Sequence, residues 1–504
     1  MSSGSILLTT EGTYPCFSGG VSHWCDQLIR RLPNYDFDVL AIGSSPHQRP
    51  IYQFPRNLRN YMMLPLWGTE EAGWQDPVVS AAVQRKLPEG ASPEDRFMEA
   101  FARTVGAVLT PSSAPGEMAE GLCGLYRYFR FYDYAQTMSS RAVWDTFRNL
   151  MIERFPGGDT LSLAEITDCM RWLLRLLAIT SVPLGDVSVV HASMAGLAGV
   201  PGVLHKRLRG VPFVITEHGI YLRELYIVLS KLPQLKACRR FLLMLADAIV
   251  RMNYEHADVV TSLCEFNRKW QQRVGCTRPT VTTPNGADPE IFRPREGGGE
   301  PATPVILTLA RIFRLKGVDV LMRAAPRVAA AIPGVKIRVL GDVADEAYFE
   351  ECMEIVRANN LQEVVEFGKT NKPADALRLA TVACIPSISE AFPFALVEAM
   401  LCGCPIVAAD VGGIAEVLAD TGLIFGSRDH EDLASALIFM LDQSPEGAAR
   451  RAGYGEAARA RALANYTMAG AIGRFETIYN AAVKGGKSGA IETIEARCAS
   501  RTSA

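Results

Sequence analysis

The sequence predicts an α/β protein built from two Rossmann-like domains whose parallel sheets face a cleft between the domains. Short β-branched runs alternate with helical segments along most of the chain, as in parallel α/β sheets. The alternation is interrupted by residues 293–304, where three glycines and three prolines in twelve residues exclude a helix or a central strand and indicate a linker. A chain of 504 residues is also too long for a single hydrophobic core.

Strands are expected in two series, one on each side of the linker. The first series is 6–10, 37–43, 187–193, 212–217 and 258–263, and the second is 305–311, 336–341, 364–368, 382–386, 405–409 and 422–426. We expect an N-terminal domain over 1–292, a C-terminal domain over 305–465, a helix over 466–485 that returns to the N-terminal domain, and a disordered tail over 486–504. Ligands of such sheets bind outside the carboxyl ends of the strands, so the loops after strands are where functional residues are expected.

A segment without a convincing strand, 68–185, interrupts the first series and is expected to be a helical insertion. It carries an aromatic run at 126–134. An amphipathic helix would pack such rings into a core, whereas an exposed platform of rings would suit a carbohydrate or a protein partner. The sequence leaves both interpretations open.

Composition and charge are those of an ordinary globular enzyme. The chain is 48% hydrophobic and 21% charged with a net charge of −2, so no general field favours nucleic acid or anionic lipid. No run reaches the roughly 18 apolar residues that cross a bilayer, and the first residues do not have the pattern of a secretory signal. The twelve cysteines form no CxxC pair and are expected to be buried free thiols. These features predict a cytoplasmic protein.

The strongest functional signal is the segment 389–398, SEAFPFALVE, which follows a predicted strand. A helix is expected to begin near Pro393, because proline is favoured in the first turn. The backbone N–H groups of Phe394 and Ala395 would then form a positive helix end that suits a phosphate. The segment therefore predicts a phosphate site.

Two carboxylates in this segment, Glu390 and Glu398, need a different ligand because a phosphate would repel them. Both are expected to accept hydrogen bonds from hydroxyl groups, Glu390 from a sugar and Glu398 from a ribose. A helix with one dipole-complementing glutamate would explain one carboxylate but not both. Phe392 lies between them and is also expected to contact the donor.

A basic loop at 310–317, ARIFRLKG, follows the first strand of the second series. Arg311 and Lys316 can bracket a diphosphate, since arginine offers a bidentate fork and lysine a point charge. Arg314 lies between them and could replace either one. The loop could also be a solvent-exposed basic loop without a binding role. Lys369, after the strand at 364–368, is a further candidate for donor binding.

In the first series, candidates again follow strands. Gly19 and Gly20 precede an amphipathic helix and would let the backbone come close to a ligand, although a glycine pair is also an ordinary turn. His218 follows the strand at 212–217 and is expected to face the cleft rather than to be a core or capping histidine. His191 ends another strand and is equally consistent with either environment.

Two familiar patterns are rejected. Asp36 and Asp38 match the DxD pattern of metal-dependent transferases, but they open an apolar strand instead of ending one and are expected to be surface carboxylates. The first strand is not followed by GxxxxGK[ST] or GxGxxG, which argues against P-loop and dinucleotide enzymes.

The spacing from Glu390 to Glu398 resembles the E-x7-E pattern of retaining glycosyltransferases with the GT-B fold. Similarity to glycosyltransferase family 4 extends to Arg311, Lys316, Gly19 and Gly20, and to segments 284–288 (PNGAD), 408–410 and 411–416. Two islands of the N-terminal half, at 11–24 and 216–221, resemble the cytosolic transferases of Pel exopolysaccharide synthesis. The family's glycine after the first glutamate is Ala391 here.

The resemblance implies transfer of a hexosyl unit from a nucleotide-sugar, expected to be a UDP-sugar, to a saccharide acceptor, with retention of configuration and without a metal or other cofactor. Arg311, Lys316 and the helix end would stabilise charge on the departing diphosphate. Glu390 and His218 would act at the donor sugar, His218 by orienting it and not as a required base. The implied partner is a polysaccharide synthase complex at the inner membrane.

Three other interpretations remain. A glycosyl phosphorylase or a nucleotide-sugar epimerase would keep the diphosphate site and lack a long acceptor groove. A non-catalytic scaffold of a synthase complex is the third, although such a protein would not need the charged residues Glu390, Glu398, Arg311 and Lys316.

Overall fold

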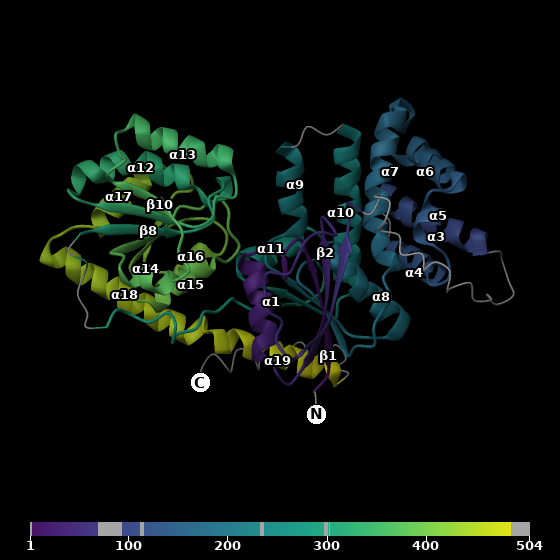
Figure 1. Cartoon of the computed structure of the whole chain (residues 1–504), viewed down its shortest axis with the longest axis horizontal. Coiled ribbons are helices and arrows are strands. Elements are labelled where there is room, and N and C mark those ends of the chain that lie inside the picture. Colours follow the sequence, from purple (N-terminus) through teal and green to yellow (C-terminus); the bar gives the residue numbers. More distant parts are fainter. Residues whose placement is uncertain are drawn as a thin grey trace. The chain divides into compact units, whose positions relative to one another are not determined.

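A computed structural model describes residues 3–68, 93–110, 115–231, 236–296, 301 and 303–484 (Figure 1). The chain folds into two compact units. Of the described residues, the N-terminal unit takes those in 1–262, 268–281 and 476–484, and the C-terminal unit takes those in 263–267 and 282–475. The expected tail, 486–504, and part of the linker lie outside the described residues.

The N-terminal unit contains a seven-stranded sheet in the order β3-β2-β1-β4-β5-β6-β7. Its strands are β1 (Ser5–Glu11), β2 (Asp36–Gly43), β3 (Leu58–Pro65), β4 (Val189–Ala192), β5 (Phe213–Glu217), β6 (Val259–Ser262) and β7 (Thr280–Thr282). The pairs from β3 across to β6 are parallel. The five predicted strands are confirmed, and the two edge strands β3 and β7 are additional.

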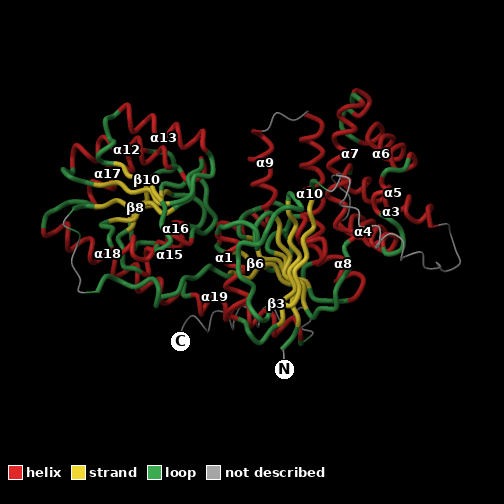
Figure 2. The backbone as a smooth tube through the Cα atoms, in the orientation of Figure 1, coloured by secondary structure: helices red, strands yellow, loops and turns green. Residues whose placement is uncertain are grey.

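Helices cover this sheet and extend beyond it (Figures 1 and 2). They are α1 (Gly20–Arg31), α3 (Pro93–Leu109), α4 (Pro115–Phe129), α5 (Tyr134–Met138), α6 (Arg141–Arg154), α7 (Leu163–Leu177), α8 (Val200–Arg209), α9 (Tyr221–Lys231) and α10 (Lys236–His256), with α11 (Glu265–Arg273) beginning in the C-terminal unit and ending in this one. The described part of the segment 68–185 beyond β3 is helical, and α3, α4 and α7 pack against α10. A capping box between Ser162 and Glu165 fixes the start of α7.

The aromatic run at 126–134 contributes to the core of these helices. Tyr126 and Phe129 are buried, and the Phe129 ring packs against Phe97 of α3 and against Tyr134. Tyr128 lies 4.7 Å from Phe97, ring centre to ring centre. The packed-helix interpretation therefore describes most of these rings.

The C-terminal unit contains a six-stranded sheet in the order β10-β9-β8-β11-β12-β13 (Figure 2). Its strands are β8 (Val305–Leu309), β9 (Lys336–Leu340), β10 (Val365–Gly368), β11 (Val382–Ile385), β12 (Ile406–Ala409) and β13 (Leu423–Phe425), all parallel and all predicted. Its helices are α12 (Val318–Ala331), α13 (Glu346–Ala358), α14 (Pro373–Arg378), α15 (Phe394–Leu401), α16 (Ile414–Leu418), α17 (His430–Met440) and α18 (Pro445–Asn465). None of the helices among the described residues of the whole chain is long and apolar enough to cross a membrane.

The last helix, α19 (Met468–Val483), begins in the C-terminal unit and ends in the N-terminal unit. Its end completes the core of the N-terminal unit, where the Tyr479 hydroxyl lies 2.6 Å from His191 Nδ1. His191 Nε2 lies 2.7 Å from the Thr216 hydroxyl, and the Tyr35 hydroxyl donates to Asn480 Oδ1 at 3.0 Å. Burial lowers the pKa of His191 to about 3, with the nearby His218 adding to the effect. His191 is thus a neutral core histidine with both ring nitrogens bonded.

Candidate functional site

Two loops of the C-terminal unit meet at the carboxyl ends of the central strands β8 and β11. The loop after β8 ends at Gly317, which has a φ of 62° and whose place no residue with a Cβ could take, because that atom would collide with the Pro386 carbonyl oxygen. The Ile388 N–H donates to the Leu315 carbonyl at 2.8 Å. The basic loop and the start of the glutamate segment are therefore fixed to each other by backbone contacts.

The loop after β12 holds the same segment from a third strand. Gly412 has a φ of 61°, and a Cβ there would collide with the carbonyl oxygen of Glu390. The Gly413 N–H donates to the Ala391 carbonyl at 2.9 Å. This close backbone approach requires glycine and sets the position of Glu390, with alanine accepted at residue 391.

Lys316 and Glu390 form an ion pair within this group of loops. Their side chains are 22% and 12% exposed, and the Ser387 hydroxyl donates to Glu390 Oε1 at 3.2 Å. The two residues were expected to contact different parts of one donor, and the structure brings them into direct contact with each other. Their separation of 74 residues explains why the pairing is not evident from sequence.

Arg311 lies on the same loop as Lys316, and both cations lie over the ring of Phe313. The guanidinium carbon of Arg311 is 5.3 Å and the Lys316 Nζ 6.0 Å from the ring centre. Arg314 instead pairs with Glu351 at 2.6 Å and lies over the Tyr348 ring. The loop thus presents Arg311 with Lys316, and Arg314 has other partners.

Glu398 lies one turn inside α15, a helix that is otherwise apolar and buried. Pro393 is the N-cap of this helix, so its first turn contains Phe394 and Ala395, both partly buried. Burial raises the pKa of Glu398 to about 7, and no opposing charge offsets that rise. The partly exposed, desolvated carboxyl group therefore suits a ligand that donates hydrogen bonds to it.

Two other predicted donor residues, Phe392 and Lys369, contact side chains other than Lys316 and Glu390. Phe392 is buried against the Tyr466 ring, with ring centres 5.7 Å apart. Lys369 follows the edge strand β10 and pairs with Asp342 at 2.7 Å with its side chain 72% exposed. Phe392 has a packing role, and Lys369 lies at the edge of the sheet.

In the N-terminal unit, Gly19 and Gly20 lie where α1 begins after β1. Gly20 is the first residue of α1, and the His23 N–H donates to the Gly19 carbonyl at 2.8 Å. A Cβ at Gly19 would meet no atom within 4 Å. The protein itself thus leaves space open beside this helix end.

His218 follows β5, and its ring packs edge-on against Trp24 of α1 with ring centres 4.5 Å apart. Its Nε2 is buried and has no hydrogen-bond partner among the described residues. Burial lowers the pKa of His218 to about 3, so the imidazole is neutral near pH 7. A neutral ring with an unused nitrogen can donate to or accept from a ligand hydroxyl.

Three further candidate site residues near the carboxyl ends of the N-terminal strands were not predicted. Glu217, before His218, accepts hydrogen bonds from Tyr254 and Gln271, and burial raises its pKa to about 7 despite them. Trp24 supports His218, and Glu11 is the last residue of β1. Both glutamates lie at the carboxyl ends of strands, so the criterion that identified His218 could have identified them too. Trp24 could not have been identified, because in the sequence it is only one of the apolar residues along a helix.

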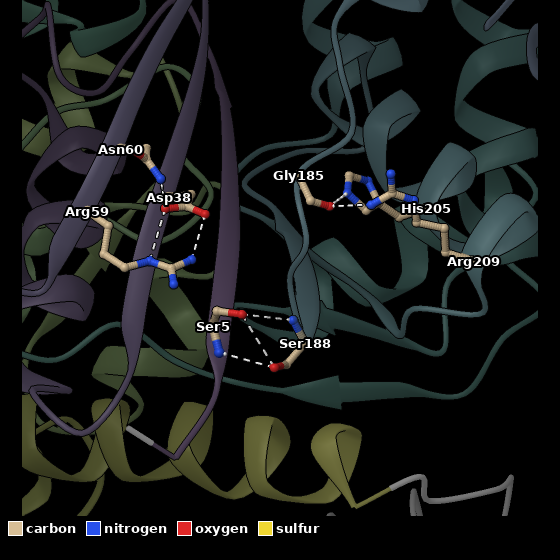
Figure 3. Close-up of polar contacts among 8 residues, drawn as sticks. All are labelled: Ser5, Asp38, Arg59, Asn60, Gly185, Ser188, His205 and Arg209. Carbon is tan, nitrogen blue, oxygen red and sulfur yellow. Dashed lines mark hydrogen bonds and ion pairs between the residues drawn. The ribbon is translucent and has the colours of Figure 1, made fainter. Parts of the chain in front are cut away.

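Asp36 and Asp38 lie at the opposite end of the strands, where β2 begins; Figure 3 shows Asp38. Asp38 accepts from Arg59 at 2.9 Å and from Asn60 at 2.9 Å. Among the residues described, no group of three or more histidine, cysteine, aspartate or glutamate side chains is arranged to hold a metal ion.

Comparisons with known proteins follow the two-unit division. Residues 4–279 match the family described as Domain of unknown function (DUF3492), and residues 288–461 match Glycosyl transferases group 1. D-inositol 3-phosphate glycosyltransferase 1 of Catenulispora acidiphila is 30% identical over 326 residues, which are 60% of this chain and 74% of the relative. The D-inositol 3-phosphate glycosyltransferase of Corynebacterium aurimucosum is 29% identical over 310 residues, 58% of this chain and 72% of that protein.

Two solved structures share the architecture over most of the chain. A sucrose-phosphate synthase from Thermosynechococcus elongatus superimposes with a TM-score of 0.58 at 18% identity, covering 94% of this chain and 98% of that one. HepE of Anabaena in complex with UDP gives a TM-score of 0.55 at 14% identity, covering 93% and 98%. The chain therefore belongs to the group 1 glycosyl transferases, with a DUF3492 N-terminal region and the GT-B fold, and it is a glycosyltransferase enzyme.

Proposed function

We propose that this enzyme transfers a hexosyl unit from a UDP-sugar to a saccharide acceptor with retention of configuration and without a metal ion. The observation that carries the proposal is the group formed by Arg311, Lys316 and Glu390 beside the helix that bears the desolvated Glu398. It combines fixed positive charge for a diphosphate with two carboxylates for hydroxyl groups. A nucleoside diphosphate sugar has both features.

The diphosphate would bind Arg311, Lys316 and the first turn of α15, where the helix dipole is positive. Donor binding then requires Lys316 to exchange its bond with Glu390 for a phosphate oxygen. The released carboxylate is free to accept hydrogen bonds from the donor sugar. The ion pair thus keeps both side chains ready at low cost, because each exchanges one charge-assisted hydrogen bond for another.

Glu398 would accept from the ribose hydroxyls. Its raised pKa fits this role, because two hydroxyl donors supply the hydrogen bonds that the ionised carboxylate now lacks. Breakage of the sugar–phosphate bond leaves negative charge on the diphosphate, which Arg311 and Lys316 would stabilise in the transition state. His218, neutral near pH 7, would orient the donor sugar without acting as a base.

UDP is the first nucleotide to test because HepE, the structural neighbour above, is described in complex with UDP. An exopolysaccharide acceptor of the Pel type, with an inner-membrane synthase complex as partner, rests on the sequence islands at 11–24 and 216–221. The inositol glycosyltransferase relatives give a competing acceptor, D-inositol 3-phosphate. Both acceptors belong in one assay.

A thermal-shift panel of UDP, GDP and ADP with their sugars tests the donor, since a ligand that binds only the native state raises the melting temperature. We expect UDP and a UDP-sugar to stabilise the enzyme and Lys316→Ala to abolish the effect. No shift with any nucleotide would overturn the proposal. Conversion of the UDP-sugar without any acceptor would identify an epimerase, and a reaction that requires added phosphate would identify a phosphorylase. Binding of the UDP-sugar without transfer to any acceptor would identify a non-catalytic scaffold.

A further inference from the structure

The N-terminal unit contains a pocket of about 260 Å³ that the proposed donor chemistry does not use. It lies over the carboxyl ends of β1, β2 and the loop after β3, and α7, α9 and α10 close it from the other side. Carboxyl ends of parallel strands are where such sheets bind ligands. The helical insertion, through α7, therefore builds one wall of a site in the expected position.

The helical walls of the pocket are apolar. Leu242, Leu245 and Ala246 of α10 line it together with leucines of α7 and α9. Trp67 and Trp172 close one side with their rings edge-on, at a centre-to-centre distance of 5.1 Å. These walls suit an alkyl or aryl group, since they offer no charge and few hydrogen-bonding atoms.

The sheet end of the pocket has one strong hydrogen-bond acceptor, the carboxyl group of Glu11. The Tyr221 hydroxyl donates to its Oε1 at 3.1 Å, and the Ala198 N–H donates to Oε2 at 3.4 Å. The Leu197 backbone N–H also bonds to this carboxyl group, so of its roughly four acceptor positions about one is left for a ligand hydroxyl. Burial raises the pKa of Glu11, because these hydrogen bonds offset only part of the desolvation.

The loops that form the pocket also carry two predicted site residues, Gly19 for binding and His218 for catalysis. Gly12 lines the pocket and begins the loop that leads to Gly19, and Tyr221 follows His218 by three residues. The charged groups assigned to the donor, Arg311, Lys316, Glu390 and Glu398, all lie in the C-terminal unit. A pocket on the loops of Gly19 and His218 is thus suited to the other substrate.

We propose that this pocket binds the acceptor, and that the acceptor is an amphiphile whose alkyl or aryl group fills the pocket while a hydroxyl group bonds to Glu11. The inference rests on the proposed function and adds the chemical class of the acceptor to it. A glycoside with an apolar aglycone has this chemistry.

Alkyl β-glucosides from methyl to octyl, below their micelle concentrations, test the proposal as acceptors with the UDP-sugar. We expect KM to fall about fourfold for each added methylene until the pocket is full, since each buried methylene contributes about 0.8 kcal/mol. Ala246→Leu should remove this dependence by filling the pocket. Ala248→Leu is the matched control, because Ala248 lies on the same helix and lines a different cleft. Leu245→Ala should move the optimum to longer chains.

Equal KM values for methyl and octyl glucoside in the wild type would overturn the proposal, as would a chain-length dependence unchanged in Ala246→Leu. The proposed function fails separately, by the absence of stabilisation by UDP. In that case calorimetric titration with octyl glucoside still tests whether the pocket binds an amphiphile. Binding that is lost in Ala246→Leu and kept in Ala248→Leu would support the proposal, and no binding to the wild type would reject it.

Discussion

Glu398 and Glu390 are eight residues apart, and their environments differ more than their spacing suggests. Glu390 is paired with Lys316, whereas Glu398 has no such partner among the described residues and desolvation raises its pKa to about 7. A carboxyl group whose pKa is higher in the folded state than in the unfolded state makes the free energy of unfolding fall as the pH rises from the unfolded pKa to the folded pKa. Above the folded pKa the free energy of unfolding stays at this lower level. The proposed ribose contact is thus built at the expense of stability.

Replacement of Glu398 by Gln should therefore raise the melting temperature at pH 8 and leave it nearly unchanged at pH 5, because Gln cannot lose a proton. The same variant should lose most of its stabilisation by UDP. Thermal unfolding at both pH values, with and without UDP, measures both effects. A variant less stable than the wild type at pH 8, or one that UDP stabilises normally, would show that Glu398 has a structural role.

Arg311→Ala and Lys316→Ala should each lower kcat/KM by roughly ten- to hundredfold or more, since each removes a charge-assisted contact worth about 1.5–3 kcal/mol. Arg314→Ala is the matched control on the same loop. It removes an equal charge from an exposed ion pair with Glu351, so activity and stability should change little. Steady-state kinetics on the three variants decide the point, and wild-type turnover by both Arg311→Ala and Lys316→Ala would reject the diphosphate site.

Gly19→Ala should keep its melting temperature and lose affinity for substrate. The added methyl meets no protein atom within 4 Å and would occupy the space left open at the start of α1. Gly185→Ala is a control, since a Cβ there also meets nothing and Gly185 lies at the opposite edge, with its carbonyl bonded by His205 and Arg209 (Figure 3). Equal KM values for the two variants would mean that no ligand comes close to Gly19.

At the scale of elements, the hydrophobic pattern was sufficient for the C-terminal sheet and insufficient at the two edges of the N-terminal sheet. All six strands from β8 to β13 were predicted, including the edge strands β10 and β13. β3, with the sequence LRNYMMLP, is partly exposed and mixes polar with apolar residues, and β7 has only three residues. Long-range pairings such as Lys316 with Glu390 were also missed, because tertiary contacts and not local patterns create them.

The end of α19 is an element whose contribution can be measured through Tyr479. Tyr479→Phe should lower the free energy of unfolding by about 1–3 kcal/mol, because it leaves the buried Nδ1 of His191 without its partner. Tyr14→Phe is the control: that hydroxyl is buried in the same unit and has no hydrogen-bond partner among the described residues, so its loss should be neutral or stabilising. Chemical denaturation measures the change in the free energy of unfolding for both variants. Equal changes would show that the hydrogen bond between Tyr479 and His191 does not contribute to stability.

At the scale of the whole molecule, the proposed mechanism uses fixed cations where other transferases use a divalent metal. Activity should accordingly survive EDTA at concentrations that inactivate a metal-dependent transferase assayed in parallel. Asp38, the best candidate in a DxD pattern, is already bonded to Arg59 and Asn60. Complete loss of activity on chelation, restored by Mn²⁺ or Mg²⁺, would contradict this.

During synthesis, the N-terminal unit leaves the ribosome long before the helix that completes it. The ribosome must add the residues between Val281 and Tyr479 first, which takes about ten to forty seconds at about 5–20 residues per second. Until then the apolar surroundings of His191 and Tyr35 lack the Tyr479 ring that covers them. The nascent N-terminal unit is therefore a natural client for chaperones, and a gene fragment that stops at the linker encodes an incomplete domain.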